Sequence, residues 1–188
     1  MPEVSTKVIT PEFRASYARV FEPAEQPNGD MAYSVQMIFP KSTDLSEMKA
    51  AAEAAMTKQF GEKSKWPKNY WNPFRDGDTD RDAPEYKDTI FILAKTKNQP
   101  GIVDQNVQPI MSSDEFYSGC YARASVVFYA FDKGGNKGIG VGLNNIMKTR
   151  DGERLDGKRS AEEDFAAFAG ATSDAGDSGF SGDKEAPF

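Results

Sequence analysis

The feature that most constrains the fold of this chain is an alternation of apolar and polar side chains with a period of two. The alternation is clearest between Phe116 and Phe131, where one set of alternate positions is apolar: Ala122, Ala124, Val126, Phe128 and Ala130. Successive side chains of a β-strand point to opposite faces, so this pattern predicts a strand with one face on a core. The other face is amphipathic and carries Tyr121, Arg123, Ser125, Val127 and Tyr129.

Further segments carry strand signals. Residues 13–21 and 33–39 are expected to pair as an antiparallel hairpin, because the typical turn residues between them are Pro23, Pro27, Asn28 and Gly29. The apolar run at residues 89–96 predicts a strand buried on both faces. A hairpin turn at residues 132–136 is expected to lead into a strand at 139–146. The chain is therefore expected to be mainly β.

The strand at 139–146 is flanked and interrupted by alternate glycines at positions 138, 140 and 142, which leave one face nearly without side chains. Glycines in a strand indicate a bend, close strand packing or an approach by another backbone, such as that of DNA. A dinucleotide-binding loop is rejected, because no helix N-terminus follows to hold a phosphate.

One longer helix is expected after the first hairpin. Asp44 with Glu47 three residues later is an N-cap signature, and Gly61 is a helix-ending residue. Between them a helical stripe of apolar side chains consists of Leu45, Met48, Ala52, Ala55, Met56 and Phe60.

The composition of the chain changes near the C-terminus, from residue 160 onward. Ser160 with Glu163 predicts a short helix that carries Phe165 and Phe168 and ends at Gly170. Residues 171–187 are rich in Gly, Ser, Ala and Asp and too poor in apolar surface to offset the entropy of ordering. We expect a folded domain at 1–170 and a disordered acidic tail at 171–188.

Composition excludes several kinds of chemistry. The chain has no histidine and a single cysteine, Cys120, so zinc sites and histidine-based triads lack their usual groups and no intrachain disulfide can form. Cys120 is expected to be a small buried side chain. No cofactor is indicated. No run reaches the ~18 apolar residues of a membrane span and Met1 to Thr10 lack the pattern of a signal peptide, so a soluble intracellular protein is expected.

The net charge of −6 is concentrated near the C-terminus. Residues 160–188 hold seven acidic side chains against Lys184, whereas residues 1–159 hold equal numbers of acidic and basic ones. The body can therefore carry a basic groove although the chain as a whole is acidic.

The densest aromatic and basic cluster lies at residues 63–75. Rings can stack on bases and cations can neutralise phosphates, so such a cluster favours binding to single-stranded nucleic acid. Trp66, Trp71 and Phe74 could equally cap the hydrophobic core. The candidate DNA-binding residues are Lys63, Lys65, Trp66, Lys68, Tyr70, Trp71, Phe74, Arg75, Lys95, Lys97, Tyr117, Tyr121, Arg123 and Tyr129.

Two other functions stay open. Carboxylates between Asp76 and Asp88 could hold a metal ion for a nuclease or recombination enzyme, although Arg81 and Lys87 occupy positions where a calcium loop needs Gly and Glu. A solvated turn is the alternative for this segment. The aromatic cluster could also dock a protein, which would make the chain an adaptor without affinity for DNA.

The C-terminus ends in a rigid proline, a large ring and a free carboxylate on an acidic segment. Such a tip suits an apolar pocket with a basic rim. The candidate partner-binding residues are Asp183, Glu185, Pro187 and Phe188. The acidic side chains could also compete with DNA for the protein's own basic groove.

Four segments carry a resemblance that covers most of residues 5–165: Asn72 to Asp78, Pro100 to Asp104, Phe116 to Val126 and Gly138 to Ile146. They resemble a bacteriophage family of single-stranded DNA-binding proteins, formerly catalogued as a domain of unknown function. The Pro187-Phe188 tip is similar to that of bacterial single-stranded DNA-binding proteins, which recruits replication and repair partners, but Lys184 interrupts the acidic run here.

The resemblance implies an OB-fold, a five-stranded, partly open antiparallel barrel, here with a long aromatic and acidic insertion. It implies a non-enzymatic protein that binds and protects single-stranded DNA without sequence preference during phage DNA replication, recombination and repair, in the cytoplasm of the infected bacterial host. Replication or recombination proteins are the partners it suggests for the tail, and self-association along DNA is allowed. No membrane partner is expected.

Overall fold

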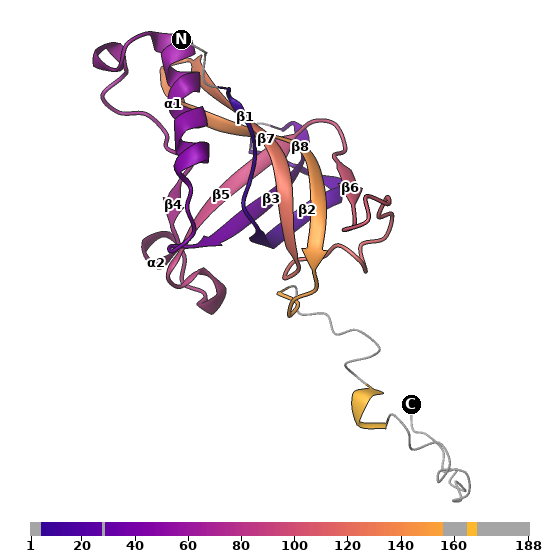
Figure 1. Ribbon diagram of the computed structural model, residues 1–188. Helices are drawn as coiled ribbons and strands as arrows, with labels where there is room; N and C mark the ends of the chain where they lie inside the picture. The colour runs from indigo at the N-terminus through magenta and orange to yellow at the C-terminus, as the bar shows by residue number, and fades with distance from the viewer. Residues whose placement is uncertain (1–4, 28, 156–164, 169–188) are drawn as a thin grey trace, which may run out of the picture. The chain divides into compact units, whose positions relative to one another are not determined.

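The computed structural model describes residues 5–27, 29–155 and 165–168 (Figure 1). The strands are β1 (Lys7–Ile9), β2 (Phe13–Glu25), β3 (Met31–Pro40), β4 (Arg75–Asp76), β5 (Thr89–Thr96), β6 (Gly101–Val103), β7 (Tyr121–Lys133) and β8 (Asn136–Arg150). The helices are α1 (Ser46–Phe60), the single-turn α2 (Gly77–Asp80) and the 3-10 turns η1 (Lys63–Lys65), η2 (Pro84–Tyr86) and η3 (Ala166–Phe168). In the described part of the chain, no helix is long and apolar enough to span a membrane.

Five of the strands form a ring of pairings. The order β7–β2–β3–β5–β8 returns to β7, because β7 and β8 also form a long antiparallel hairpin. Two junctions of the ring are short: β2 meets β7 at Phe13 and Arg14, and β5 meets β8 only at Lys95. The mainly β, OB-like fold is confirmed, with a sheet that is partly ring-like and less regular than a barrel.

One edge of the sheet contains parallel pairings within the otherwise antiparallel arrangement. Both β5 and β6 pair with β8 in parallel, through Lys95 with Gly142 and through residues 101–103 with residues 145–147. The reason lies in the connection: the chain between β5 and β6 makes only a short bend, so β6 continues in the direction of β5 along the same edge of β8. Strands β1 and β4 are short additions at the edges of β7 and β5.

The β2–β3 hairpin is confirmed, but its turn is shorter than expected. Strand β2 continues through Pro23 to Glu25, and the turn lies at residues 26–30. Pro23 is tolerated because the pairing register shifts between Arg19 and Ala24, where the ladder needs no N–H donor. The turn between β7 and β8 is also confirmed, since Gly134 and Gly135 have φ values of +56° and +88° that suit a tight hairpin.

Helix α1 is the longer helix that the apolar stripe predicts. Its buried side chains are Met48, Ala51, Ala52, Ala55 and Met56, and it packs mainly against β7 (Figure 1). The helix begins one residue later than expected, because Leu45 is the N-cap and Asp44 accepts a hydrogen bond from the Ser46 N–H at 3.0 Å. Gly61 ends it with a φ of +85°.

The main core fills the ring, and a smaller cluster of Ile38, Tyr86 and Phe91 lies on the outer face of the sheet. This second cluster exists because the segment with α2 and η2 folds over the first half of β5. The expectation that β5 is buried on both faces is therefore right for that half and wrong for the second half, where Leu93 and Lys95 are exposed. Cys120 is buried as expected, and burial raises the pKa of its thiol to about 11.

Near the C-terminus the structure describes only residues 165–168. A single 3-10 turn is present there, and the rings of Phe165 and Phe168 are exposed, with centroids 6.4 Å apart. The predicted capping pair Ser160 and Glu163, the end at Gly170 and the acidic tail lie outside the described residues.

Candidate nucleic-acid interface

The outer face of the sheet carries a groove of about 320 Å³ that collects four of the predicted DNA-binding side chains. These are Trp71, Arg75, Lys95 and Tyr129. The groove lies between β3, β5, β7 and β8 on one side and the insertion that precedes β5 on the other. Its remaining lining is Gln36, Pro73, Arg81, Phe91, Leu93, Phe131, Ile139, Gly140 and Val141.

Trp71 is fixed to the groove by its backbone. Its N–H donates to the Lys137 carbonyl at 2.9 Å, and its carbonyl accepts from the Ile139 N–H at 3.0 Å. Gly138 makes this approach possible, since a Cβ at that position would lie 2.5 Å from the Trp71 Cβ. The indole stays 54% exposed. A rigid backbone therefore presents an open ring at the rim of the groove.

Tyr129 supplies a second ring and explains another glycine. A Cβ at Gly140 would lie 2.3 Å from the Tyr129 ring, so the ring lies over the bare backbone of β8. The ring is still 46% exposed, and the partial burial of the side chain raises the pKa of Tyr129. The glycine-lined face of β8 is thus covered by the protein's own rings.

The groove is positively charged. Among the described residues that line it, Arg75, Arg81 and Lys95 are cationic and none is acidic. The Arg75 guanidinium lies 5.2 Å from the Trp71 ring centroid, and its Nε lies 3.3 Å from Asp80 outside the groove. Lys95 is exposed and pairs with no carboxylate in the described part of the chain.

The guanidinium group of Arg81 lies over two aromatic rings. Its guanidinium lies 4.8 Å from the Phe91 centroid and 5.7 Å from the Tyr86 centroid. Its Nε is buried and has no hydrogen-bond partner in the described structure. A buried donor without a partner is costly, so an acceptor atom of a ligand would be stabilised there.

A polar network supports the edge of the groove. The Tyr86 hydroxyl donates to Gln36 Oε1 at 2.5 Å, and its oxygen lies 2.9 Å from Ser16 Oγ. Burial raises the pKa of Tyr86, so the phenol stays a donor. This network ties β2, β3 and η2 together beneath the exposed side chains.

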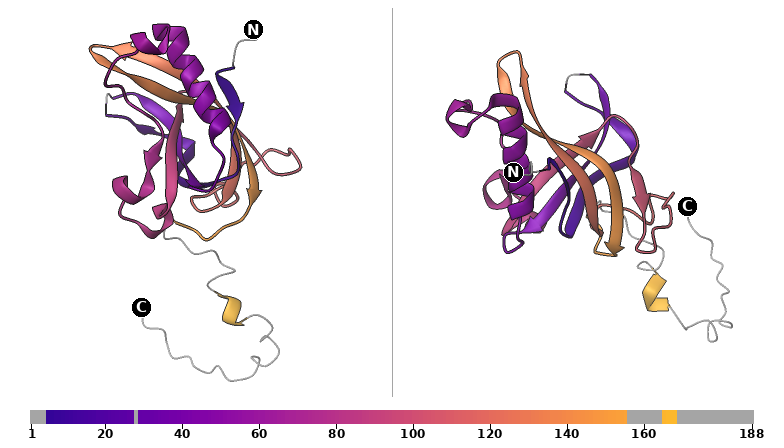
Figure 2. Two further views of the ribbon diagram at one scale, coloured as in Figure 1. Left: turned by 60° about the vertical axis from the view of Figure 1, so that its left-hand side comes forward. Right: turned by 45° about the horizontal axis from the view of Figure 1, so that its top comes forward.

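A second hollow of about 930 Å³ continues from the first and contains Lys97. The two hollows share Lys95, Tyr129 and Phe131. The second one lies between the β2–β3 turn and the β7–β8 turn, which project at the same end of the ring (Figure 2). A linear ligand could therefore follow the surface from Trp71 past Tyr129 to Lys97.

Other members of the aromatic and basic cluster lie outside the groove. Trp66, Tyr70 and Phe74 are half-buried against the core; Phe74 stacks on Phe128 with a centroid separation of 5.9 Å, and Trp66 donates to the Gly61 carbonyl at 2.9 Å. For these three rings the core-capping alternative describes the structure. The exposed cations of the same segment are Lys63, Lys65 and Lys68.

Tyr117, Tyr121 and Arg123 lie toward the other end of β7. Tyr121 and Tyr129 are eight residues apart, which is about 26 Å along a strand. The Tyr121 ring lies 3.7 Å from the Arg150 guanidinium carbon. Tyr117 donates to Asp151 at 2.9 Å, and Arg123 is exposed. The structure places these side chains at a separate surface from the Trp71 groove.

The carboxylates between Asp76 and Asp88 are engaged with the protein. Asp76 and Asp78 both pair with Lys41, at 3.1 and 2.7 Å. The hydrogen bond from the Asp78 N–H, followed by the contact with Lys41, lowers the pKa of Asp76, and the contact with Lys41 lowers the pKa of Asp78. Asp78 also accepts from the Asp88 N–H at 2.9 Å. In the described ranges no group of three or more potential metal ligands is present.

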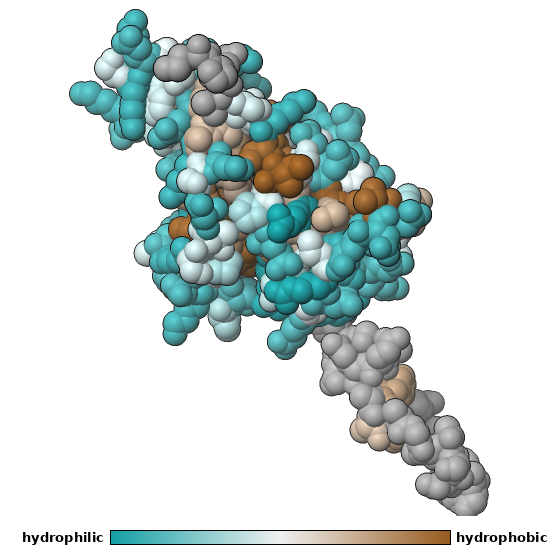
Figure 3. Space-filling view, viewed as in Figure 1, coloured by the Kyte–Doolittle hydropathy of each residue, from teal (hydrophilic) through white to brown (hydrophobic). Residues whose placement is uncertain are grey.

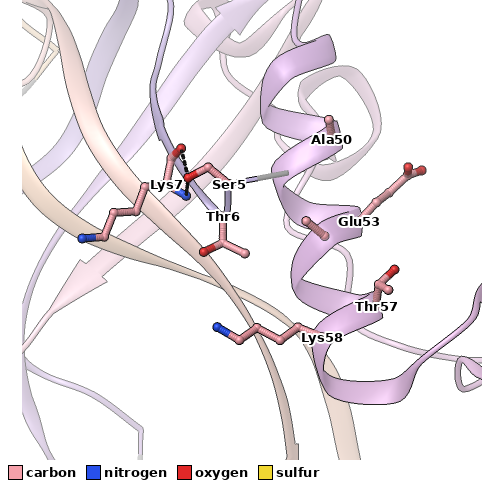
Figure 4. A pocket seen from close by; sticks show the side chains of 8 residues that line it. Ser5, Thr6, Lys7, Ala50, Glu53, Thr57 and Lys58 are labelled. Atoms are coloured by element: carbon pink, nitrogen blue, oxygen red, sulfur yellow. Dashed lines mark hydrogen bonds between the residues drawn. The ribbon is translucent and has the colours of Figure 1, made fainter. Parts of the chain in front are cut away.

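Two further surface features lack the combination of rings and cations. An apolar patch lies over β1, whose Ile9 is exposed (Figure 3). A hollow between the start of β1 and α1 has Lys7, Glu53 and Lys58 beside small side chains, and none of its described lining residues is aromatic (Figure 4). Neither offers a stacking surface for a base.

Sequence reasoning missed Gln36, Arg81, Phe91 and Phe131 as groove residues. A signal for Phe91 existed, because Phe91, Leu93 and Lys95 alternate along one face of β5. Arg81 had no such signal: it lies in an acidic loop, and only the folding of that loop over β5 brings it to Phe91.

Known proteins are similar to this chain in sequence and in fold. Residues 6–177 match the family model described as Enterobacter phage Enc34, ssDNA-binding protein. Protein p50 of Acyrthosiphon pisum secondary endosymbiont phage 1 is 32% identical over 163 residues, which cover 80% of this chain and 87% of p50.

Two solved structures show the same fold. The single-stranded DNA-binding protein from bacteriophage Enc34, in complex with ssDNA, has a TM-score of 0.69 at 22% identity, covering 80% of this chain and 89% of that chain. The protein gp2.5, a single-stranded DNA-binding protein encoded by bacteriophage T7, has a TM-score of 0.59 at 13% identity, covering 82% and 97%. The extent of the family match shows that this chain belongs to the Enc34 phage ssDNA-binding protein family.

Proposed function

We propose that this protein binds single-stranded DNA without sequence preference, through the groove of Trp71, Arg75, Arg81, Lys95 and Tyr129. The observation that carries the proposal is the groove itself, where the described lining residues include two exposed rings, three cations and no carboxylate. Every base has a face that stacks on a ring, and every nucleotide link has a phosphate, so this lining suits any sequence.

The similarity to known proteins supports single-stranded DNA as the ligand. The family is named for an ssDNA-binding protein, and the Enc34 relative was solved with ssDNA bound. The groove favours a single strand over a duplex because the bases of a duplex are stacked on each other and cannot reach the rings of Trp71 and Tyr129. We infer a passive role inside the infected cell: covering single strands during phage DNA replication, recombination and repair, without chemical change to the DNA.

Fluorescence anisotropy of a labelled single strand against a matched duplex tests this function. The single strand is expected to bind more tightly, and its affinity is expected to fall with salt at a log–log slope of about −3, the value for roughly four neutralised phosphates. Those phosphates correspond to contacts with Arg75, Arg81, Lys95 and Lys97.

The same samples separate the other two functions. A gel of the DNA after incubation with magnesium is expected to show intact strands, and cleavage would favour the nuclease. Absence of binding at low salt would favour the protein adaptor. Equal affinity for single strand and duplex would contradict a stacking site.

We propose that residues 1–170 form the DNA-binding domain and that residues 171–188 form an acidic tail with a separate role. The tail's acidic side chains and its Pro187-Phe188 tip suit either recruitment of a replication or recombination protein or competition with DNA for the groove. Deletion of residues 171–188 is expected to strengthen DNA binding at low salt if the tail competes. Unchanged affinity after the deletion would favour recruitment of a partner protein as the role of the tail. Partner binding by the intact and the truncated protein would test that role.

A further inference from the structure

Strand β2, which pairs with the groove strand β3, contains a residue with a strained backbone. Tyr17 has a φ of +47°, a backbone conformation that a bulky residue rarely adopts. Its side chain is nevertheless 57% exposed, so burial of the ring does not hold it there. The pairing of β2 with β3 shifts register between Ser16 and Arg19, which identifies Tyr17 and Ala18 as a β-bulge.

The bulge reverses which face each residue of β2 occupies. Before it, Phe13 and Ala15 face the core, and after it Ala18 and Val20 do. Uninterrupted alternation would send Tyr17 into the core and Ala18 to the surface. The bulge therefore keeps Tyr17 out of the core and leaves it exposed between Ser16 and Arg19, which pair with Gln36 and Ser34 of β3.

Contacts on both sides hold the bulge in place. The Ala18 N–H donates to Ser118 Oγ at 2.9 Å, and the Gly119 N–H donates to the Ala15 carbonyl at 2.8 Å. Ser16 belongs to the network through Tyr86 to Gln36, and Gln36 lines the groove. Because the surrounding structure maintains a costly backbone conformation, the exposed ring is a candidate for a functional contact.

A row of paired residues joins this bulge to the groove. Arg19 lies opposite Ser34, Ser34 opposite Lys95, and Lys95 opposite Gly142. Directly opposite residues share a face, so Arg19 and Lys95 flank the small Ser34 on the outer face, about 10 Å apart across two strand spacings. Arg19 is exposed and pairs with no carboxylate in the described ranges.

We propose that Tyr17 and Arg19 form a second nucleotide subsite, in which the Tyr17 ring stacks on a base and Arg19 contacts the adjoining phosphate. The ligand is the same single strand as in the proposed function, on which this inference rests, extended across β3 onto β2. The subsite supplies what the Trp71 groove also supplies, a ring and a cation, on a neighbouring strand of the same face.

The variant Tyr17→Gly separates the ring from the backbone. Glycine adopts a positive φ without strain, so the free energy of unfolding is expected to equal or exceed that of the unaltered protein in urea denaturation. Affinity for an oligothymidine of about twelve nucleotides is expected to fall about tenfold, whereas one of about four nucleotides, bound at the Trp71 groove, is expected to bind as before. Tyr17→Phe, which keeps a ring, is the matched control and should retain affinity.

Two further variants sharpen the test. Tyr17→Asn removes the ring and tolerates the left-handed backbone, so it is expected to reproduce the loss if Tyr17→Gly fails to fold. Arg19→Gln is expected to make the salt slope shallower by about 0.7, the contribution of one phosphate contact.

The outcomes distinguish this inference from the proposed function. Unaltered affinity of Tyr17→Gly or Tyr17→Asn for the longer strand would overturn the second subsite, even if variants of Trp71 lose binding. An equal loss for both lengths would also overturn it, because the effect would then act through the Trp71 groove. Failure of the unaltered protein to bind either strand would instead refute the proposed function.

Discussion

Replacement of Trp71 by alanine is expected to lower affinity for single-stranded DNA by about one to two orders of magnitude. Stacking of a base on an aromatic ring is worth about 1 to 3 kcal/mol, and Trp71 is the more exposed of the groove's two described stacking rings. The substitution also frees the Arg75 guanidinium from its contact with the indole. The backbone hydrogen bonds of residue 71 to Lys137 and Ile139 do not need the side chain, so the fold is expected to persist.

The second tryptophan provides the control. Trp66 is half-buried against the core and donates to Gly61, so Trp66→Phe is expected to cost some stability and to leave DNA affinity unchanged. The chain has only two tryptophans, so the tryptophan fluorescence of Trp66→Phe comes from Trp71 alone. Bound DNA is expected to quench this fluorescence. Anisotropy titrations that show equal affinity for Trp71→Ala and the unaltered protein would exclude the groove as the stacking site.

Replacement of Gly119 by alanine is expected to lower the free energy of unfolding by about 3 kcal/mol or more, through a steric clash added to backbone strain. A Cβ at this position would lie 2.0 Å from the Glu153 carbonyl oxygen, and the φ of +117° is one that side chains rarely adopt. The clash is with backbone, which cannot rotate away as a flexible side chain can. Gly119 also donates to Ala15 and accepts from Arg14 Nε at 3.2 Å, so the change disturbs β2 directly.

Gly134→Ala is the matched control for this loss of stability. Gly134 also has a positive φ, +56°, but a Cβ there would meet nothing within 4 Å. Its substitution should cost only about 1 kcal/mol, because strain acts there without a clash. Urea denaturation measures both variants. Equal losses for Gly119→Ala and Gly134→Ala would show that the contact with Glu153 relaxes at little cost.

The regular elements follow from local patterns in the sequence. Period two identified β2, β3 and the long β7, a continuous apolar run identified β5, and the apolar stripe with Gly61 identified α1. Elements of two or three residues, such as β1, β4 and β6, carry no periodic signal of their own. They are strands only because a longer neighbour offers a free edge.

The sequence predicted which kinds of side chain form the candidate site, but not which individual residues belong to it. Trp71 and Trp66 stand five residues apart in the same aromatic and basic segment, yet one ring is exposed at the groove and the other packs on the core. Their surroundings in the sequence do not differ enough to separate them. The difference arises from Gly138 on β8, whose missing side chain lets the Trp71 backbone pair there.

The mainly β class, the positions of the long strands and of the longer helix, and the concentration of rings and cations before β5 could all be predicted from the sequence. Local periodicity and composition carry this information, because each depends on residues close in the chain. The contact of Arg81 with Phe91 and the bulge that keeps Tyr17 out of the core could be recognised only in the folded protein. These features depend on contacts between segments far apart in sequence, such as Ala18 with Ser118, whose free energies are set by packing in the folded ring.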